Sequence, residues 1–97
     1  MLFLGIDPWL TGAVACVHED GRMLWVKDTP TVWVGTKAHY DPTGMALVLH
    51  AWGAVAFPAP ARVTIEQQQA MPNQGVTSSF TTGVGYGLWL GILAAKE

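Results

Sequence analysis

The hydrophobic positions of the first third of the chain fall into short runs separated by turn-forming residues. The first run, residues 2–7, ends in Asp7, and Pro8 stops it because proline donates no backbone hydrogen bond. Residues 13–18 and 22–27 form two further runs. They are separated by Asp20-Gly21, a dipeptide typical of tight hairpin turns. This pattern predicts three strands in an antiparallel meander.

The middle of the chain predicts a loop followed by a helix. Residues 28–40 contain the turn signals Thr29-Pro30 and Val34-Gly35, so we expect a loop there, with a short extended piece over residues 31–34. Asp41-Pro42 suits a helix start, with Asp41 as the N-cap and Pro42 at the first helical position. Apolar residues at helical spacing follow, and we expect this helix to end near Gly53.

The remainder of the chain predicts one more strand and a long helix. Residues 62–66 form a fourth apolar run, which ends in Glu66, and residues 76–96 are expected to be helical. A strand that follows a crossover helix usually lies parallel to an earlier strand, and the apolar first strand is its natural partner. The expected fold is therefore α/β: a mixed sheet, made of a three-strand antiparallel meander plus a parallel fourth strand, with helices.

Composition narrows the class of protein. Hydrophobic residues make up 51% of the 97 residues and charged residues only 12%, which excludes a disordered chain. The net charge of −2 leaves no basic stripe that would bind nucleic acid by charge alone. So little charge also predicts leftover apolar surface, covered by a second copy, another part of the chain or a membrane. Residues 76–95 are long enough to span a bilayer, but their hydroxyl groups and glycines argue against a membrane-spanning helix.

Two carboxylates close apolar strands and are the candidates for chemistry. If the first and fourth strands are parallel neighbours, Asp7 and Glu66 emerge at the same sheet edge, where open α/β sheets build their sites. Adjacent strands lie about 4.8 Å apart, so the two side chains could share a divalent cation. The alternative is that Asp7 merely starts a turn and Glu66 is a solvated strand end.

Longer motifs around these carboxylates resemble a known family. Gly5-Ile6-Asp7-Pro8 followed by Gly12, together with Val63-Thr64-Ile65-Glu66-Gln67, resembles the RuvC family of Holliday junction resolvases. QAMPNQGVTSSF (residues 69–80) and GVGYGLW (residues 83–89) are similar to its phage and prophage branch. The resemblance implies an RNase H-like fold, a homodimer, and Mg²⁺-dependent cleavage of four-way DNA junctions, with Mn²⁺ as a substitute. It also implies a cytoplasmic location in a bacterial or phage-infected cell.

The resemblance assigns Asp7 and Glu66 as catalytic metal ligands. The family completes its site with two further acidic residues on a helix near the C-terminus, after a fifth strand. We therefore expect residues 1–97 to be the N-terminal portion of a single RNase H-like nuclease domain, with weak activity by itself. Trp9 departs from the family, which usually has Gly after Asp-Pro, and its bulk can narrow access for DNA.

The segment after the fourth strand supplies the candidate DNA contacts. Its amides and hydroxyls suit phosphate and sugar contacts without charge. We expect polar contacts from four residues: Asn73, Gln74, Ser78 and Ser79. Met71 or Phe80 would be an apolar wedge at an opened base step. The alternative is a polar loop that caps the helix, with Phe80 in the core.

Three glycines four residues apart, Gly83, Gly87 and Gly91, share one face of the expected long helix. This face either packs on the sheet of its own subunit or pairs with the same helix of a second subunit. We favour the dimer interface, with Leu88, Trp89 and Leu90 adding apolar area.

Other residues carry less information about function. No metal-binding spacing links His18, His39 and His50, and the other tryptophans, Trp25, Trp33, Trp52 and Trp89, are predicted to be packing residues. A competing function is a non-catalytic DNA-binding or dimerisation module of the same fold. A third is a nucleotide-binding fragment of the actin-like or sugar-kinase type, because Gly-Ile-Asp with a later Gly also opens those folds. Pro8 and Trp9 fit a phosphate-binding turn poorly.

Overall fold

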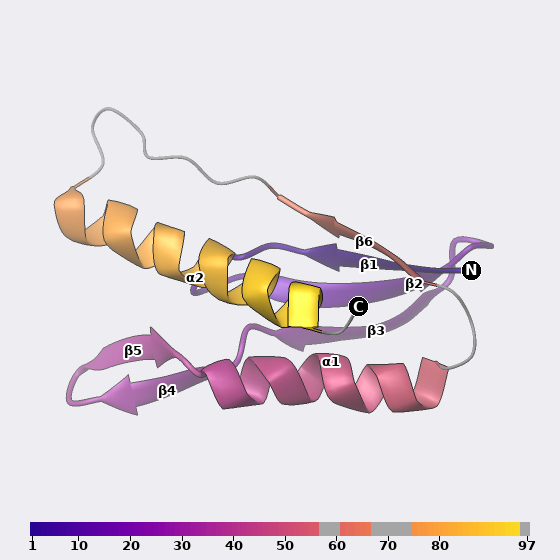
Figure 1. Ribbon diagram of the computed structural model, residues 1–97, viewed down its shortest axis with the longest axis horizontal. Coiled ribbons are helices and arrows are strands. Elements are labelled where there is room, and N and C mark those ends of the chain that lie inside the picture. The colour runs from indigo at the N-terminus through magenta and orange to yellow at the C-terminus, as the bar shows by residue number, and fades with distance from the viewer. Residues whose placement is uncertain (57–60, 67–74, 96–97) are drawn as a thin grey trace.

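A computed structural model describes residues 1–56, 61–66 and 75–95 of the chain. The elements follow one another as β1 (Leu2–Ile6), β2 (Ala13–His18), β3 (Met23–Asp28), β4 (Thr31–Val34), β5 (Lys37–Tyr40), α1 (Pro42–Ala56), β6 (Ala61–Ile65) and α2 (Val76–Ala95) (Figure 1). The structure is thus a compact α/β fold, as the sequence predicts.

The main sheet has four strands in the order β3-β2-β1-β6. Strand β2 pairs antiparallel with both β1 and β3, which confirms the predicted meander. Strand β6 runs parallel to β1, with a register that extends from Leu2 opposite Ala61 to Ile6 opposite Ile65. The first strand is therefore central, and the parallel fourth strand of the prediction is β6.

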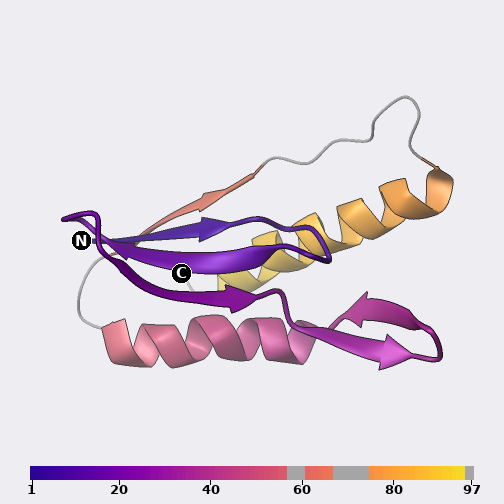
Figure 2. The same cartoon turned by 180° about the vertical axis from the view of Figure 1, so that it is seen from behind.

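Both helices cover the same side of this sheet, as the front and back views show (Figures 1 and 2). The core lies between the sheet and the helices. Its buried residues come from β1, β2, β5, α1 and α2: Ile6, Val14, Tyr40, Met45, Leu49 and Trp89. Cys16 is also fully buried on β2, and burial raises the pKa of its thiol.

The opposite side of the sheet keeps apolar side chains in contact with solvent. Side chains alternate along a strand, so Phe3 points away from the side that buries Leu2. Phe3 and Val26 are both substantially exposed there. Figure 2 shows this side with neither helix in front of it. The expectation that low charge leaves apolar surface over is confirmed within the described residues.

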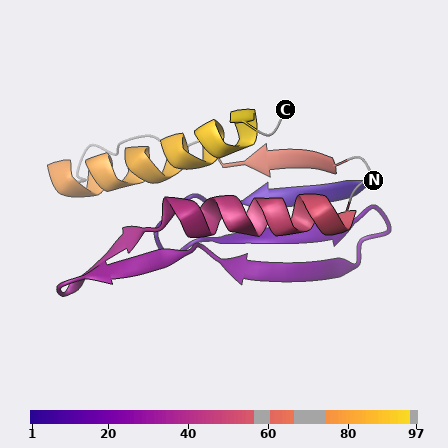
Figure 3. The same cartoon turned by 60° about the horizontal axis from the view of Figure 1, so that its bottom comes forward.

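The extended piece over residues 31–34 is confirmed as strand β4, but the loop prediction for the rest of residues 28–40 is wrong, because β4 pairs with a further strand, β5, in a second sheet. Strands β4 and β5 pair antiparallel from Thr31 opposite Tyr40 to Val34 opposite Lys37. Gly35 turns the chain with a φ of 63°, in the left-handed region that favours glycine. The Val34-Gly35 signal therefore marks a hairpin turn between two β-forming stretches. The hairpin projects beyond the end of the main sheet (Figure 3).

The hairpin also corrects the prediction that Trp33 is a packing residue, since its side chain is 68% exposed. Trp89 and Trp25 do pack in or against the core, as expected. The side chain of Trp52 lies outside the described residues.

The helix start at Asp41 is confirmed. The Gly44 amide donates to Oδ1 of Asp41 at 3.1 Å, and the Met45 amide donates to the Asp41 carbonyl at 2.9 Å. The helix continues through Gly53 to Ala56, because one interior glycine weakens a helix without ending it. In the described part of the chain, neither helix is both long enough and apolar enough to cross a membrane.

Candidate metal centre

Asp7 and Glu66 each stand one residue beyond the last paired residues of β1 and β6. Ile6 is opposite Ile65 in the parallel register, and the Glu66 amide donates to the Ile6 carbonyl at 3.1 Å. Both residues are exposed. The two carboxylates therefore follow neighbouring strands at one edge of the sheet, as the sequence predicts.

The chain reverses sharply after Asp7. The Asp7 amide donates to the Ala13 carbonyl at 2.9 Å, and the Gly12 amide donates to the Trp9 carbonyl at 2.8 Å. A Cβ atom at Gly12 would overlap the carbonyl oxygen of Asp7, so the turn requires glycine at this position. The glycine that the sequence pattern places after Asp-Pro is thus needed for a close backbone approach.

The Asp7 carboxylate accepts a hydrogen bond from the backbone of its own turn. Its Oδ1 atom lies 3.2 Å from the amide nitrogen of Trp9. The Trp9 side chain is partly exposed beside it, which agrees with a bulky neighbour at the site.

Tyr40, from the base of the hairpin, reaches the same turn. Its hydroxyl donates to the Pro8 carbonyl at 2.8 Å, and its side chain is only 8% exposed. Burial raises the pKa of Tyr40, and the negative charge of Asp7 raises this pKa further. The hydroxyl is therefore neutral and close enough to Asp7 to feel its charge. Sequence reasoning missed Tyr40, since nothing in the local pattern around it points to Pro8.

The donor set suits a hard divalent cation. Carboxylate oxygens are the ligands that Mg²⁺ prefers, and Mg²⁺ commonly uses one or two of them together with water. Within residues 1–56, 61–66 and 75–95, no three His, Cys, Asp or Glu side chains gather in one place. Among these residues, Asp7 and Glu66 therefore belong to no larger cluster of ligating side chains.

The acidic residues at the β2–β3 turn have other partners. Glu19 pairs with the N-terminal ammonium at 3.2 Å, and Asp20 pairs with Nε of Arg22 at 2.8 Å. The backbone amide of Arg22 is the main reason that the pKa of Asp20 is lowered. This turn joins the opposite ends of the strands and contributes nothing to the Asp7 edge.

The candidate DNA contacts are divided between described and undescribed residues. Met71, Asn73 and Gln74 lie outside the described residues. Ser78 is exposed and Ser79 is half-buried in the first turns of α2. The other interpretation of Phe80, as a core residue, is wrong because its side chain is 74% exposed.

The glycine face of α2 does not pack on its own sheet, so that alternative is wrong. Gly83, Gly87 and Gly91 are exposed, and a Cβ atom at each would meet open space. Gly85, on another side of α2, is the glycine that is buried. Trp89 is completely buried in the core of its own chain, which removes it from the predicted dimer interface.

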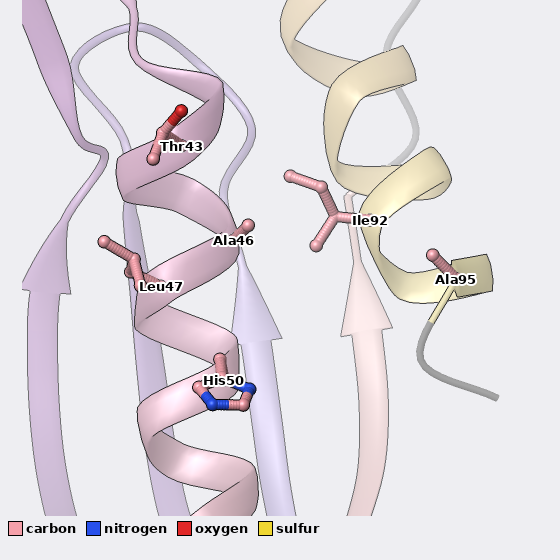
Figure 4. Close-up of a pocket in the computed structure, with 6 residues that line it drawn as sticks. All are labelled: Thr43, Ala46, Leu47, His50, Ile92 and Ala95. Carbon is pink, nitrogen blue, oxygen red and sulfur yellow. The ribbon is translucent and has the colours of Figure 1, made fainter.

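An apolar groove of about 390 Å³ lies between the two helices, separate from the carboxylates (Figure 4). Its lining comes from α1 and the C-terminal end of α2: Thr43, Ala46, Leu47, His50, Ile92 and Ala95. Neither Asp7 nor Glu66 belongs to it, so the groove is not part of the candidate metal centre.

Comparison of the sequence with protein-family models and with curated proteins found no match.

Proposed function

We propose that this chain belongs to a divalent-metal-dependent endonuclease that cleaves four-way DNA junctions. The observation that carries the proposal is the parallel pairing of β1 with β6, which brings Asp7 and Glu66 to one sheet edge across 58 residues of intervening chain. The motifs on both sides of each carboxylate, and their resemblance to RuvC resolvases, support a four-way DNA junction as the substrate.

Asp7 and Glu66 supply negative charge and oxygen ligands. Two exposed carboxylates on adjacent strands repel one another, and a shared cation relieves that repulsion. Asp7 and Glu66 would hold the ion, which would supply Lewis acidity for activating water and for stabilising charge on the phosphate. With two carboxylates as ligands, we expect millimolar rather than tight binding of the ion.

The elements that extend past the carboxylate edge would contact the DNA. The hairpin and the first turns of α2 both project beyond the carboxyl ends of β1 and β6 (Figures 1 and 3). They present aromatic side chains that are mostly exposed, Trp33 and Phe80, and the hydroxyl of Ser78. Exposed aromatic rings stack on unpaired bases, and hydroxyls bind phosphate without charge. These groups suit the open bases at a branch point.

The test is cleavage of an end-labelled four-way junction by the 97-residue chain in the presence of Mg²⁺. A linear duplex with the sequence of one junction arm is the comparison substrate. We expect slow nicking that is specific to the junction. Asp7→Asn and Glu66→Gln should each reduce the rate by roughly 100-fold or more, because each removes charge that holds the ion. Asp20→Asn is the matched control, since it removes a carboxylate from the opposite end of the sheet.

Two results would contradict the proposal. Nicking that survives both substitutions would mean that another group, or a contaminant, is responsible. Junction binding without any Mg²⁺-dependent cleavage would favour the non-catalytic DNA-binding module instead.

A further inference from the structure

We propose that Tyr40 is a positioning residue for Asp7 and acts through the peptide unit that joins Pro8 to Trp9. The inference rests on the proposed function, in which Asp7 binds a divalent cation. Tyr40 ends strand β5 of the hairpin, so it belongs to a different sheet from Asp7 and lies 32 residues after Pro8.

The carbonyl of Pro8 and the amide of Trp9 are the two ends of one peptide plane. The Tyr40 hydroxyl donates to the carbonyl oxygen at 2.8 Å. The amide at the other end of the plane donates to Oδ1 of Asp7 at 3.2 Å. Because a peptide unit is planar and rigid, fixing the carbonyl also fixes the direction of the N–H. Tyr40 and Asp7 therefore hold the same rigid unit from opposite ends.

The arrangement favours a single direction for the Asp7 carboxylate. A hydrogen bond to a carbonyl polarises its peptide and makes the N–H a better donor. Proline at position 8 restricts both its own φ and the backbone of Asp7. The freedom that remains is rotation of the Pro8–Trp9 plane, and the bond from Tyr40 removes it.

The Tyr40 hydroxyl is itself enclosed by α2. The side chain packs in the core with Met45 and Trp89. Gly85 lies against the end of the Tyr40 ring, so closely that a Cβ atom there would overlap the hydroxyl and come within 2.7 Å of the Pro8 carbonyl oxygen. The hydroxyl has no room to swing away from Pro8. The core thereby sets the orientation of a side chain that is exposed at the candidate metal centre.

The experiment removes the hydroxyl alone with Tyr40→Phe. The chain has two tyrosines, so Tyr86→Phe is a matched control in the same protein. The first measurement is the side-chain rotamer distribution of Asp7, from NMR scalar couplings in the absence of metal. The second is the dissociation constant for Mn²⁺, from water proton relaxation.

We expect Asp7 to occupy one dominant rotamer in the wild-type protein and in Tyr86→Phe, and to average between rotamers in Tyr40→Phe. Binding of Mn²⁺ should weaken about three- to tenfold in Tyr40→Phe, the range for one lost hydrogen bond. Backbone amide shifts of β1 and β2 show whether each variant keeps the fold. Unchanged Asp7 rotamers and unchanged Mn²⁺ affinity in folded Tyr40→Phe would overturn the positioning role.

The outcome separates this inference from the proposed function. The proposed metal centre is wrong if the wild-type protein does not bind Mn²⁺, or if Asp7→Asn binds it equally well. The Asp7 rotamers still decide the role of Tyr40 in that case, because they are measured without metal.

Gly85→Ala approaches the same contact from the other side. Its Cβ atom would displace the Tyr40 hydroxyl, so we expect the same averaging of Asp7 and the same weakening of Mn²⁺ binding. Gly75→Ala is the control, because Gly75 directly precedes the same helix and a Cβ atom there meets open space. If folded Gly85→Ala keeps the wild-type Asp7 rotamers and the wild-type Mn²⁺ affinity, the Tyr40 hydroxyl does not position Asp7 as proposed.

Discussion

Tyr40 and Gly12 act on the backbone around Asp7 by different means. Gly12 is needed because the chain passes so close to Asp7 that a side chain would collide with its carbonyl. Tyr40 adds a hydrogen bond from outside the turn. The first requirement is visible in the sequence as a glycine at a fixed distance from Asp-Pro, whereas the second depends on where a remote hairpin lies.

The raised pKa of Tyr40 makes the stability of the protein sensitive to high pH. Burial and the Asp7 charge disfavour the phenolate in the folded state, so its folded pKa exceeds the unfolded value of about 10. The folded protein then holds more protons than the unfolded protein above this pH. The stability that Tyr40 contributes is complete below about pH 10 and is lost as pH rises through the folded pKa.

We therefore expect the free energy of unfolding to fall more steeply as pH rises above about 10 in the wild-type protein than in Tyr40→Phe. Urea unfolding across this range measures it. Cys16 also has a raised pKa, but it is present in both proteins and cancels in the comparison. Tyr86→Phe, which removes the other tyrosine of the chain, is the matched comparison. Identical slopes for all three proteins would show that Tyr40 titrates normally.

At the scale of elements, the largest side chain that packs α2 on the core is Trp89, with Leu88, Ile92 and Leu93 partly buried around it. Trp89 is completely buried and belongs to the core cluster that includes Ile6 and Val14 of the sheet. Truncating a buried aromatic side chain lowers the free energy of unfolding, because its transfer free energy from water is lost and a cavity remains. Docking of α2 thus depends on Trp89 more than on the helix's own propensity, which its glycines lower.

Trp89→Ala should reduce the free energy of unfolding by about 3–5 kcal/mol, measured by urea denaturation with circular dichroism. Trp33→Ala removes the same side chain from the exposed hairpin and should change stability by less than about 0.5 kcal/mol. Similar losses in the two variants would mean that Trp33 is packed, in conflict with its exposure.

The elements also show where sequence patterns succeed. The strands β1, β2, β3 and β6 are predicted to within one residue, because each is a distinct apolar run next to a turn signal. The strand β5 and its pairing with β4 are missed, because β4 is exposed along its whole length and β5 is only four residues long, too short for its alternation to stand out between turn signals. Its stability comes from cross-strand pairing and from the anchoring of Tyr40, which a local pattern does not contain.

At the scale of the whole molecule, one face of α2 has no partner within the described residues. At about 100° per residue, the glycine stripe lies on the same face as Phe80 and Leu90. These two side chains are also exposed. Small residues flanked by exposed apolar side chains allow two helices to approach closely. The homodimer stays a prediction, and this face of α2 is the surface at which we expect it.

Sedimentation velocity tests the dimer directly. We expect the wild-type protein to sediment as a dimer at micromolar concentration and Gly87→Arg to sediment as a monomer. The arginine would place a long charged side chain in the contact. Leu47→Arg, which replaces an exposed apolar residue of α1, should remain dimeric. A wild-type protein that is monomeric at all concentrations would rule out this interface.

The sequence by itself determined the order of the main strands, the helix that begins at Asp41, and the position of Asp7 and Glu66 just after two parallel neighbouring strands. These follow from local periodicity and from the few ways in which a strand–helix–strand unit can connect. The tertiary structure alone decided that Tyr40 meets Pro8, that Gly85 rather than the glycine stripe is buried, and that Trp33 and Phe80 face solvent. Such facts depend on contacts between residues far apart in the chain, and no spacing within one element records them.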